Sequence, residues 1–386
     1  MPWRLTFMIS LILLIGCTQE KPVALFNGPE AAIYDQILAD YEAPDYKWGY
    51  ININGQLIIK DEYDDLREFS EGLAAASKNG LWGYIDKSGN EIIPIRYRTV
   101  KTFSEGIAVA QDLLGNFHLF TAEGTLIADS LKYEDVSFFQ DGKAMVENGH
   151  LFGFIDKNGD QIIAPEYEYA SAFRDGIALV KRDKYGFIDD KGNIHLPLEY
   201  DKLWYPSEGM VRFKKEGRYG FLIANTGIEN LNGYNQATDF QGDYAVVNDG
   251  NNYALLDKEG NKKILPYTFL DNGGENTWMY QADGKFGFLN NDGSILCLPQ
   301  YDLVMRYQEG RAGFSIDDSW GYLDEDGKMV IPAKYPLAWD FVNGYARMIS
   351  RYGFGFIDKD GNDILSPRYL EVRDFSEGLA RIQVYR

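Results

Sequence analysis

Cysteine, histidine and positive charge are scarce in this sequence of 386 residues. Its two cysteines, Cys17 and Cys297, cannot build the disulfide framework of a small secreted scaffold, and its three histidines leave little material for a metal cluster. Lys and Arg number 38 against 58 Asp and Glu, which gives a net charge of −20. Binding a nucleic-acid backbone requires clustered basic residues, so this charge balance disfavours a nucleic-acid partner.

The apolar run near the N-terminus is too short to cross a membrane. Residues 5–15 form a stretch of roughly eleven residues, whereas a helix needs about 20 to span the hydrocarbon core. The stretch is typical of the central part of an export signal. It ends in Leu14-Ile15-Gly16-Cys17, which resembles the lipobox of bacterial lipoprotein signals.

The lipobox resemblance implies a lipid anchor. It implies that residues 1–16 are a signal peptide that is removed and that Cys17 then carries the lipid. Several acyl chains hold a protein at a membrane more firmly than one. Thr18, rather than Asp, follows Cys17, and by the same resemblance this favours the outer membrane of the bacterial cell envelope, facing the periplasm or the cell surface.

Aromatic residues and glycine are abundant, and they recur together with a fixed period. The 306 residues from Trp48 to Phe354 divide into nine intervals of 34 residues, which predicts ten units. An aromatic residue stands before Gly at Trp48, Trp82, Phe152, Tyr185, Tyr219, Phe286, Trp320 and Phe354, with degenerate copies at Phe117 and Tyr253. A second series with the same spacing comprises Tyr63, Tyr97, Tyr133, Tyr167, Tyr200, Tyr234, Tyr267, Tyr301, Tyr335 and Tyr369.

Two segments show the unit most clearly. Residues 82–94 read WGYIDKSGNEIIP, and residues 320–324 read WGYLD. Both resemble the repeat of the WG-repeat family of bacterial proteins, and the resemblance extends over residues 47–386. That family is defined by its repeat and not by a reaction, so the resemblance implies a fold and no particular activity.

Each unit reads as short β-strands joined by turns, which predicts an all-β protein. Residues 82–85 and 91–93 are aromatic or β-branched, and Gly89 between them suits a hairpin loop whose last residue has positive φ. Pro94 then removes a hydrogen-bond donor, which predicts that the second strand ends there. A third strand, such as residues 107–110, follows the next turn.

Three short strands cannot form a core alone, so each unit must pack on the next. We therefore expect ten three-stranded β-repeats stacked as an open, superhelical, solenoid-like array. The alternative is a closed ring like a β-propeller, but such rings typically have four to eight blades of four strands. Residues 17–46 lie before the repeats as a tether, and residues 29–41 suit either a helical cap over the first repeat or a diverged half-unit.

The residues that could carry chemistry mostly fit structural roles. An acid recurs before the Gly of one turn in many units, as at Glu71 and Glu377, whereas a catalytic pair is needed only once. The run Asp-Lys-Asp-Gly-Asn at 358–362 lacks the spacing of a calcium loop. No phosphate-binding loop or nucleophile elbow occurs, so no cofactor is expected, and Cys297 is expected to pack as an apolar side chain.

Departures from the repeat are the better guide to a site, because a binding site needs residues that the scaffold does not. One departure is an Asn-rich stretch, and the other is Asn272-Gly273-Gly274-Glu275-Asn276-Thr277-Trp278, which we expect to form a longer loop in place of a turn. They predict a ligand-binding site in the sixth and seventh units, with these residues: Asn251, Asn252, Asn272, Glu275 and Trp278.

The sequence thus favours a non-catalytic protein over an enzyme. We expect a monomeric, lipid-anchored binding or scaffold module of the envelope whose partner is a protein or a glycan. Two alternatives stay open: a glycan hydrolase that uses one irregular repeat, and a structural spacer without a ligand. The hydrolase would need two carboxylates about 5 to 9.5 Å apart in one cleft.

Overall fold

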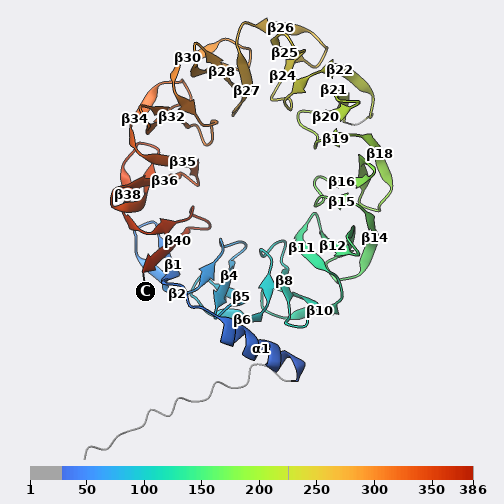
Figure 1. The fold of residues 1–386 in the computed structure, drawn as a ribbon, viewed down its shortest axis with the longest axis vertical. Helices are drawn as coiled ribbons and strands as arrows, with labels where there is room; N and C mark the ends of the chain where they lie inside the picture. The colour runs from blue at the N-terminus through green and yellow to red at the C-terminus, as the bar shows by residue number, and fades with distance from the viewer. Residues whose placement is uncertain (1–27, 225, 386) are drawn as a thin grey trace, which may run out of the picture.

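The computed structural model describes residues 28–224 and 226–385, and in this part of the chain ten four-stranded antiparallel sheets form a closed ring (Figure 1). Each sheet is one blade of a ten-bladed β-propeller. The all-β prediction and the repeat are confirmed, whereas the expected open array is wrong and the closed ring is the architecture present.

Nine blades are continuous in sequence, and the tenth combines both ends of the chain. Blade 1 has β3 (Asp65–Leu66), β4 (Leu73–Lys78), β5 (Leu81–Asp86) and β6 (Glu91–Tyr97); blade 2 has β7 (Thr99–Val100), β8 (Ala108–Gln111), β9 (Phe117–Phe120) and β10 (Leu126–Leu131); blade 3 has β11 (Asp135–Gln140), β12 (Lys143–Asn148), β13 (Leu151–Asp156) and β14 (Gln161–Tyr167). Blade 4 has β15 (Tyr169–Ala170), β16 (Ile177–Arg182), β17 (Lys184–Asp189) and β18 (Ile194–Tyr200); blade 5 has β19 (Lys202–Leu203), β20 (Met210–Lys215), β21 (Arg218–Ile223) and β22 (Glu229–Tyr234); blade 6 has β23 (Gln236–Ala237), β24 (Tyr244–Asn248), β25 (Tyr253–Asp257) and β26 (Lys262–Leu265). Blade 7 has β27 (Phe269–Gly274), β28 (Thr277–Ala282), β29 (Lys285–Asn290) and β30 (Ile295–Tyr301); blade 8 has β31 (Leu303–Val304), β32 (Ala312–Ile316), β33 (Ser319–Leu323) and β34 (Met329–Tyr335); blade 9 has β35 (Leu337–Val342), β36 (Tyr345–Ser350), β37 (Gly353–Asp358) and β38 (Asp363–Tyr369). Blade 10 has β39 (Glu371–Val372), β40 (Leu379–Tyr385), β1 (Tyr46–Asn52) and β2 (Leu57–Tyr63).

The first strand of each blade lies toward the centre of the ring and the fourth lies at its rim (Figure 1). In blade 1 this first strand, β3, contributes only two residue pairs, Asp65↔Ser77 and Leu66↔Ala76. In seven of the ten blades the first strand has only two residues, which leaves no alternating pattern and explains why the sequence indicated three strands per unit instead of four.

The hairpin between the third and fourth strands forms as the sequence predicts. In blade 1 an Asp86 carboxylate oxygen accepts hydrogen bonds from the N–H groups of Ser88 and Asn90, both at 2.8 Å. Gly89 closes the turn with φ 83°. This conformation is unfavourable for any residue that carries a Cβ.

The two aromatic series meet across the third and fourth strands. Trp82 pairs with Tyr97, and Tyr84 with Ile93, so the longer stretch of β6 forms a bulge opposite Gly83. Pro94 lies inside this bulge, and β6 continues to Tyr97. The prediction that the strand ends at the proline is therefore wrong, because an edge strand tolerates a missing donor at a bulge.

The ring closes where β1 pairs with β40 over seven residue pairs, from Tyr46↔Tyr385 to Asn52↔Leu379. Blade 10 in turn packs on blade 1, where Trp48 and Tyr50 share a core cluster with Leu66. Of the two alternatives for residues 29–41, the helix is the one present, as α1 (Pro29–Asp40). It packs on Leu81 of blade 1 and on Leu113 of blade 2, and so lies against two blades and not over the first repeat alone.

The core lies between blades. Tyr84 and Ile93 of blade 1, for example, pack with Val100 and Phe103 of blade 2. A buried Phe lies within the inner strand or just after it in most blades, among them Phe69, Phe103, Phe139, Phe173, Phe240, Phe341 and Phe375.

Candidate functional site

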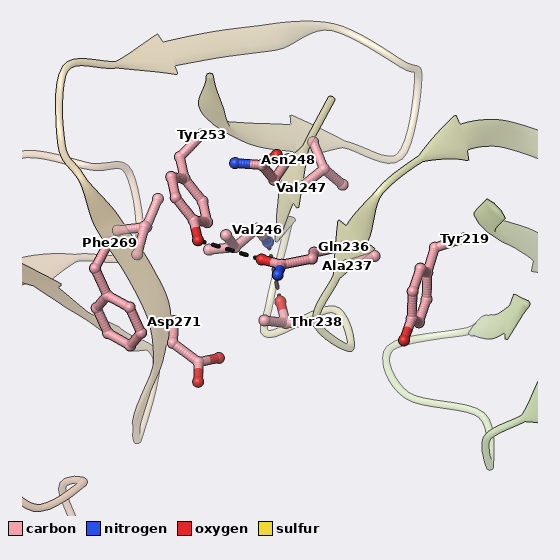
Figure 2. A pocket seen from close by; sticks show the side chains of 11 residues that line it. Tyr219, Gln236, Ala237, Thr238, Val246, Val247, Asn248, Tyr253, Phe269 and Asp271 are labelled. Carbon is pink, nitrogen blue, oxygen red and sulfur yellow. Dashed lines mark hydrogen bonds between the residues drawn. The ribbon is translucent and has the colours of Figure 1, made fainter. Parts of the chain in front are cut away.

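A cavity of about 480 Å³ lies at the inner part of blade 6, between blades 5 and 7 (Figure 2). Blade 6 supplies most of its wall, Tyr219 of blade 5 lies on one side, and the first strand of blade 7 lies on the other. The lining residues are Tyr219, Gln236, Ala237, Thr238, Val246, Val247, Asn248, Tyr253, Phe269, Leu270 and Asp271.

In blade 5, side chains fill the space that corresponds to this cavity. The Arg212 guanidinium lies 4.0 Å from the ring centroid of Trp204, and its Nε lies 2.9 Å from Oδ1 of Asp239 in blade 6. Burial raises the pKa of Asp239, and the charge of Arg212 opposes that rise. Trp204 and Arg212 together close the gap between blades 5 and 6.

Blade 6 carries small residues at the same two positions. The register makes the comparison direct, because Leu203↔Phe213 in blade 5 corresponds to Ala237↔Val247 in blade 6. One residue after Leu203 is Trp204, whereas one residue after Ala237 is Thr238. One residue before Phe213 is Arg212, whereas one residue before Val247 is Val246. The space that an indole and a guanidinium fill in blade 5 is therefore open in blade 6.

The same filling recurs near the ring closure. In blade 9 Arg347 lies 5.1 Å from the Trp339 ring, and its Nε lies 2.7 Å from Oδ1 of Asp374 in blade 10. In blade 10 Arg381 lies 5.7 Å from the Trp48 ring and pairs with Glu68 of blade 1. Three blades thus share one arrangement, in which an arginine lies against an aromatic ring and pairs with an acidic residue of the next blade.

Polar groups of the cavity come from blades 6 and 7. The Tyr253 hydroxyl donates a hydrogen bond of 3.2 Å to Oε1 of Gln236, and the Asp271 carboxylate extends from the neighbouring strand (Figure 2). Oδ1 of Asp271 accepts the N–H of Asn272 at 2.7 Å. Within residues 28–224 and 226–385 no ion pair neutralises Asp271, and among the lining residues it is the one carboxylate. The cavity therefore offers aromatic, amide and anionic groups to a ligand.

The predicted ligand-binding residues are not brought together. Asn251 and Asn252 are exposed in the turn between β24 and β25, where Asp249 accepts both N–H groups at 2.9 and 3.0 Å. The other three belong to blade 7 and lie around the turn between β27 and β28, at the opposite end of the sheet. None of these five residues lines the cavity.

The blade 7 residues have scaffold contacts. Trp278 is 0% exposed and donates from Nε1 to the Asn291 carbonyl at 3.0 Å, so its ring is part of the core. Asn272 Oδ1 accepts the N–H of Gly274 at 2.7 Å. Glu275 occupies a two-residue turn, not the longer loop that we expected, and accepts the N–H of Gly310 at 2.9 Å.

The remaining candidates fall into structural roles or lie outside the described residues. Cys297 is 7% exposed, and burial raises the pKa of its thiol to about 11. His118 contacts Asp112 and Asp129 within blade 2, whereas His150 and His195 lie in blades 3 and 4. His150 approaches Glu134 and Glu147, but its side chain is 93% exposed.

The predicted lipid-attachment residue Cys17 lies outside the described residues. In the part of the chain that the structure describes, no helix combines the length and the apolar character needed to cross a membrane.

Solved structures similar to this chain are distant in sequence. A eukaryotic initiation factor is 9% identical over 89% of this chain and 98% of its own, with a TM-score of 0.45. BamB from Moraxella catarrhalis is 12% identical over 88% and 99%, with a TM-score of 0.31. The computationally designed Ika8 protein is 13% identical over 68% and 93%, with a TM-score of 0.32. No curated protein matches the chain.

The WG containing repeat matches seven segments, which are residues 48–82, 82–112, 152–184, 185–219, 286–319, 320–348 and 354–385. Residues 220–285 lie between two of them and contain every residue that lines the cavity except Tyr219. The cavity therefore coincides with a departure from the repeat. The departure from the repeat is the sequence signal that points to it, because Thr238 by itself does not stand out: Ser137 and Ser171 hold the same position in blades 3 and 4. Because the matched segments cover more than half of its length, the chain belongs to the WG containing repeat family.

Proposed function

We propose that this protein is a non-catalytic binding module whose ten-bladed ring presents the cavity between blades 5 and 7 to a protein or glycan partner. The observation that carries the proposal is that Thr238 and Val246 leave open a space that Trp204 and Arg212 fill one blade earlier. A concave, partly polar cavity of this kind is the default place to look for a ligand.

The composition of the cavity favours binding over glycan hydrolysis. A glycosidase uses two carboxyl groups about 5 to 9.5 Å apart. The residues that line this cavity include the carboxylate of Asp271 and no second one. The recurring acids elsewhere, such as Glu71 and Glu309, accept backbone hydrogen bonds in turns.

The location that we propose is the bacterial cell envelope, with a lipid on Cys17 as the anchor. Support for it comes from the lipobox-like residues 14–17 after a short apolar run. The surface charge, with 58 acidic against 38 basic residues in the full chain, would attract a basic partner at low salt. We propose that the protein acts as a monomer, because the ring closes within one chain.

An equilibrium pull-down from envelope extract at low salt tests the function. The bait is the protein itself and a variant in which Thr238→Trp and Val246→Arg place the blade 5 residues in blade 6. We expect the unaltered bait to recover a partner and the filled variant to lose it. Ile264→Arg is the matched control, because it adds the same charge to blade 6 at a side chain that is 64% exposed and outside the cavity. Recovery of nothing, or equal recovery by the filled variant, would overturn the proposal, as would turnover of a glycan by the purified protein.

A further inference from the structure

We propose that the cavity is a vacated arginine site and that it takes the guanidinium of an arginine side chain from a partner protein. This inference rests on the proposed function and names the chemistry of the partner. Its starting point is that the protein itself places arginine side chains in the equivalent space of other blades.

The backbone acceptor is the first part of the site. Nη1 of Arg212 donates to the Ala237 carbonyl at 2.5 Å, and Nη1 of Arg67 donates to the Val100 carbonyl at 2.7 Å. Nη1 of Arg381 donates to the Leu66 carbonyl in the same way. Each acceptor is the second residue of the first strand in the next blade.

In blade 7 the second residue of the first strand is Leu270, and it lines the cavity. The N–H of Thr238 donates to the Val246 carbonyl, so Ala237 and Val247 form a pair that is not hydrogen-bonded to each other. In such a pair the carbonyl points away from the partner strand, and the Ala237 carbonyl therefore points away from β24. Leu270↔Tyr280 has the same register in blade 7. The Leu270 carbonyl is therefore directed as the Ala237 carbonyl is, but no arginine of blade 6 reaches it, because Val246 stands where blade 5 has Arg212.

An aromatic ring is the second part. Arg67 lies 4.6 Å from the centroid of the Trp82 ring, and Arg381 lies 5.7 Å from that of Trp48. Tyr253 is the residue of the aromatic series in blade 6, and it lines the cavity with its hydroxyl held by Gln236. A planar guanidinium stacks on such a ring better than an ammonium group does.

A carboxylate is the third part. Internal arginines pair with an acid of the next blade, Asp239 for Arg212 and Asp374 for Arg347. In blade 7 the acid is Asp271, one position earlier than in those blades, and its side chain extends beside the cavity (Figure 2). A guanidinium in the cavity would therefore meet a ring, a carbonyl oxygen and a carboxylate, which together offer it a stacking surface, hydrogen-bond acceptors and an opposite charge.

The test titrates N-acetyl-arginine methylamide into the protein and follows the methyl NMR signals of Val246 and Leu270. We expect saturable shifts of these methyl signals. The neutral isostere N-acetyl-citrulline methylamide should bind at least about tenfold more weakly, and so should the lysine analogue, because only the arginine probe combines the charge with the fork of donors. Asp271→Asn should weaken the arginine probe about tenfold while the protein stays folded. Val246→Arg should abolish its binding, and Ile264→Arg should leave it unchanged.

Equal binding of the arginine and citrulline probes would overturn the inference, and so would unchanged binding to the Asp271→Asn variant. The pull-down separates this failure from failure of the proposed function. One outcome is that the filled variant loses a partner that the arginine probe does not displace from the unaltered protein, and another is that a glycan displaces this partner. In either case the binding function stands and the arginine inference fails. If the arginine probe displaces the partner, the inference is supported.

Discussion

The Glu377 carboxylate in blade 10 accepts a hydrogen bond of 3.0 Å from the backbone N–H of Gly72 in blade 1, although 305 residues separate them. Consecutive blades show the same relationship, for example Glu71 with Gly106 at 2.8 Å and Glu309 with Gly344 at 2.8 Å. The turn acids adopt positive φ, 52° at Glu71 and 49° at Glu377. The contact that joins one blade to the next thus also joins the two ends of the chain.

These carboxylates make the stability of the ring depend on pH. Burial by itself would raise the pKa of Glu377, but Lys87 and the Gly72 N–H outweigh it, so the pKa lies below the ordinary value of 4.5. A lowered pKa in the folded state adds stability above pH 4.5 that is lost as the pH falls through the folded pKa. We expect Glu377→Gln to lower the free energy of unfolding by at most about 1 kcal/mol at pH 7, because the side chain is partly exposed.

Urea unfolding at pH 7 and at pH 3.5 measures this effect. The difference between the protein and the Glu377→Gln variant should shrink at the lower pH. Asp175→Asn is the matched control, because the Asp175 side chain is 90% exposed, and it should change stability at neither pH. A loss for Glu377→Gln that is as large at pH 3.5 as at pH 7 would contradict the assignment.

The Gly of the aromatic-Gly pair is required by a close backbone contact. A Cβ on Gly83 would lie 2.5 Å from the Ile93 carbonyl oxygen and 2.7 Å from the Ile95 nitrogen, and neither backbone atom can move away cheaply. We expect Gly83→Ala to cost about 3 kcal/mol in urea unfolding. Gly72→Ala, where φ is 85° and no atom lies within 4 Å, should cost only about 1 kcal/mol. Equal losses would show that the close contact is unimportant.

Arg212 offsets the cost of burying Asp239 between blades 5 and 6. In Arg212→Met the pKa of Asp239 would rise further, because burial would act without the opposing charge. Because the Asp239 side chain is 38% exposed, we expect a loss of about 2 kcal/mol at pH 7. The loss should shrink as the pH falls and Asp239 takes up a proton, and the double variant Arg212→Met, Asp239→Asn should recover part of it. A loss that the second substitution does not reduce would contradict this account.

Lipid attachment at Cys17 predicts how the protein behaves in bacterial cells. We expect metabolic labelling with an alkyne-bearing fatty acid to mark the protein and its recovery in the membrane fraction. Cys17→Ser should lose the label and leave the membrane fraction, because the acyl chains supply the anchor. Cys297→Ser is the matched control and should keep both properties, since Cys297 is buried in the core. A Cys17→Ser variant that stays labelled would refute the attachment site.

Local features of this fold were readable from the sequence because they depend on neighbouring residues. The 34-residue period, the strand at Trp82 and the Asp86–Gly89 turn all require contacts within one unit. The resemblance that identified the family rests on the same features. The two-residue first strand was not readable, because Asp65–Leu66 is too short to show a pattern and is recognised only by its pairing with β4.

The closed ring and the cavity were decided by tertiary structure. Closure depends on the angle at which one blade packs on the next and on the pairing of β1 with β40, and no local pattern encodes either. The cavity depends on which side chains point from blade 6 toward blade 7. Thr238 and Val246 are ordinary strand residues in sequence, and they form a site only because the fold places them where Trp204 and Arg212 fill the neighbouring gap.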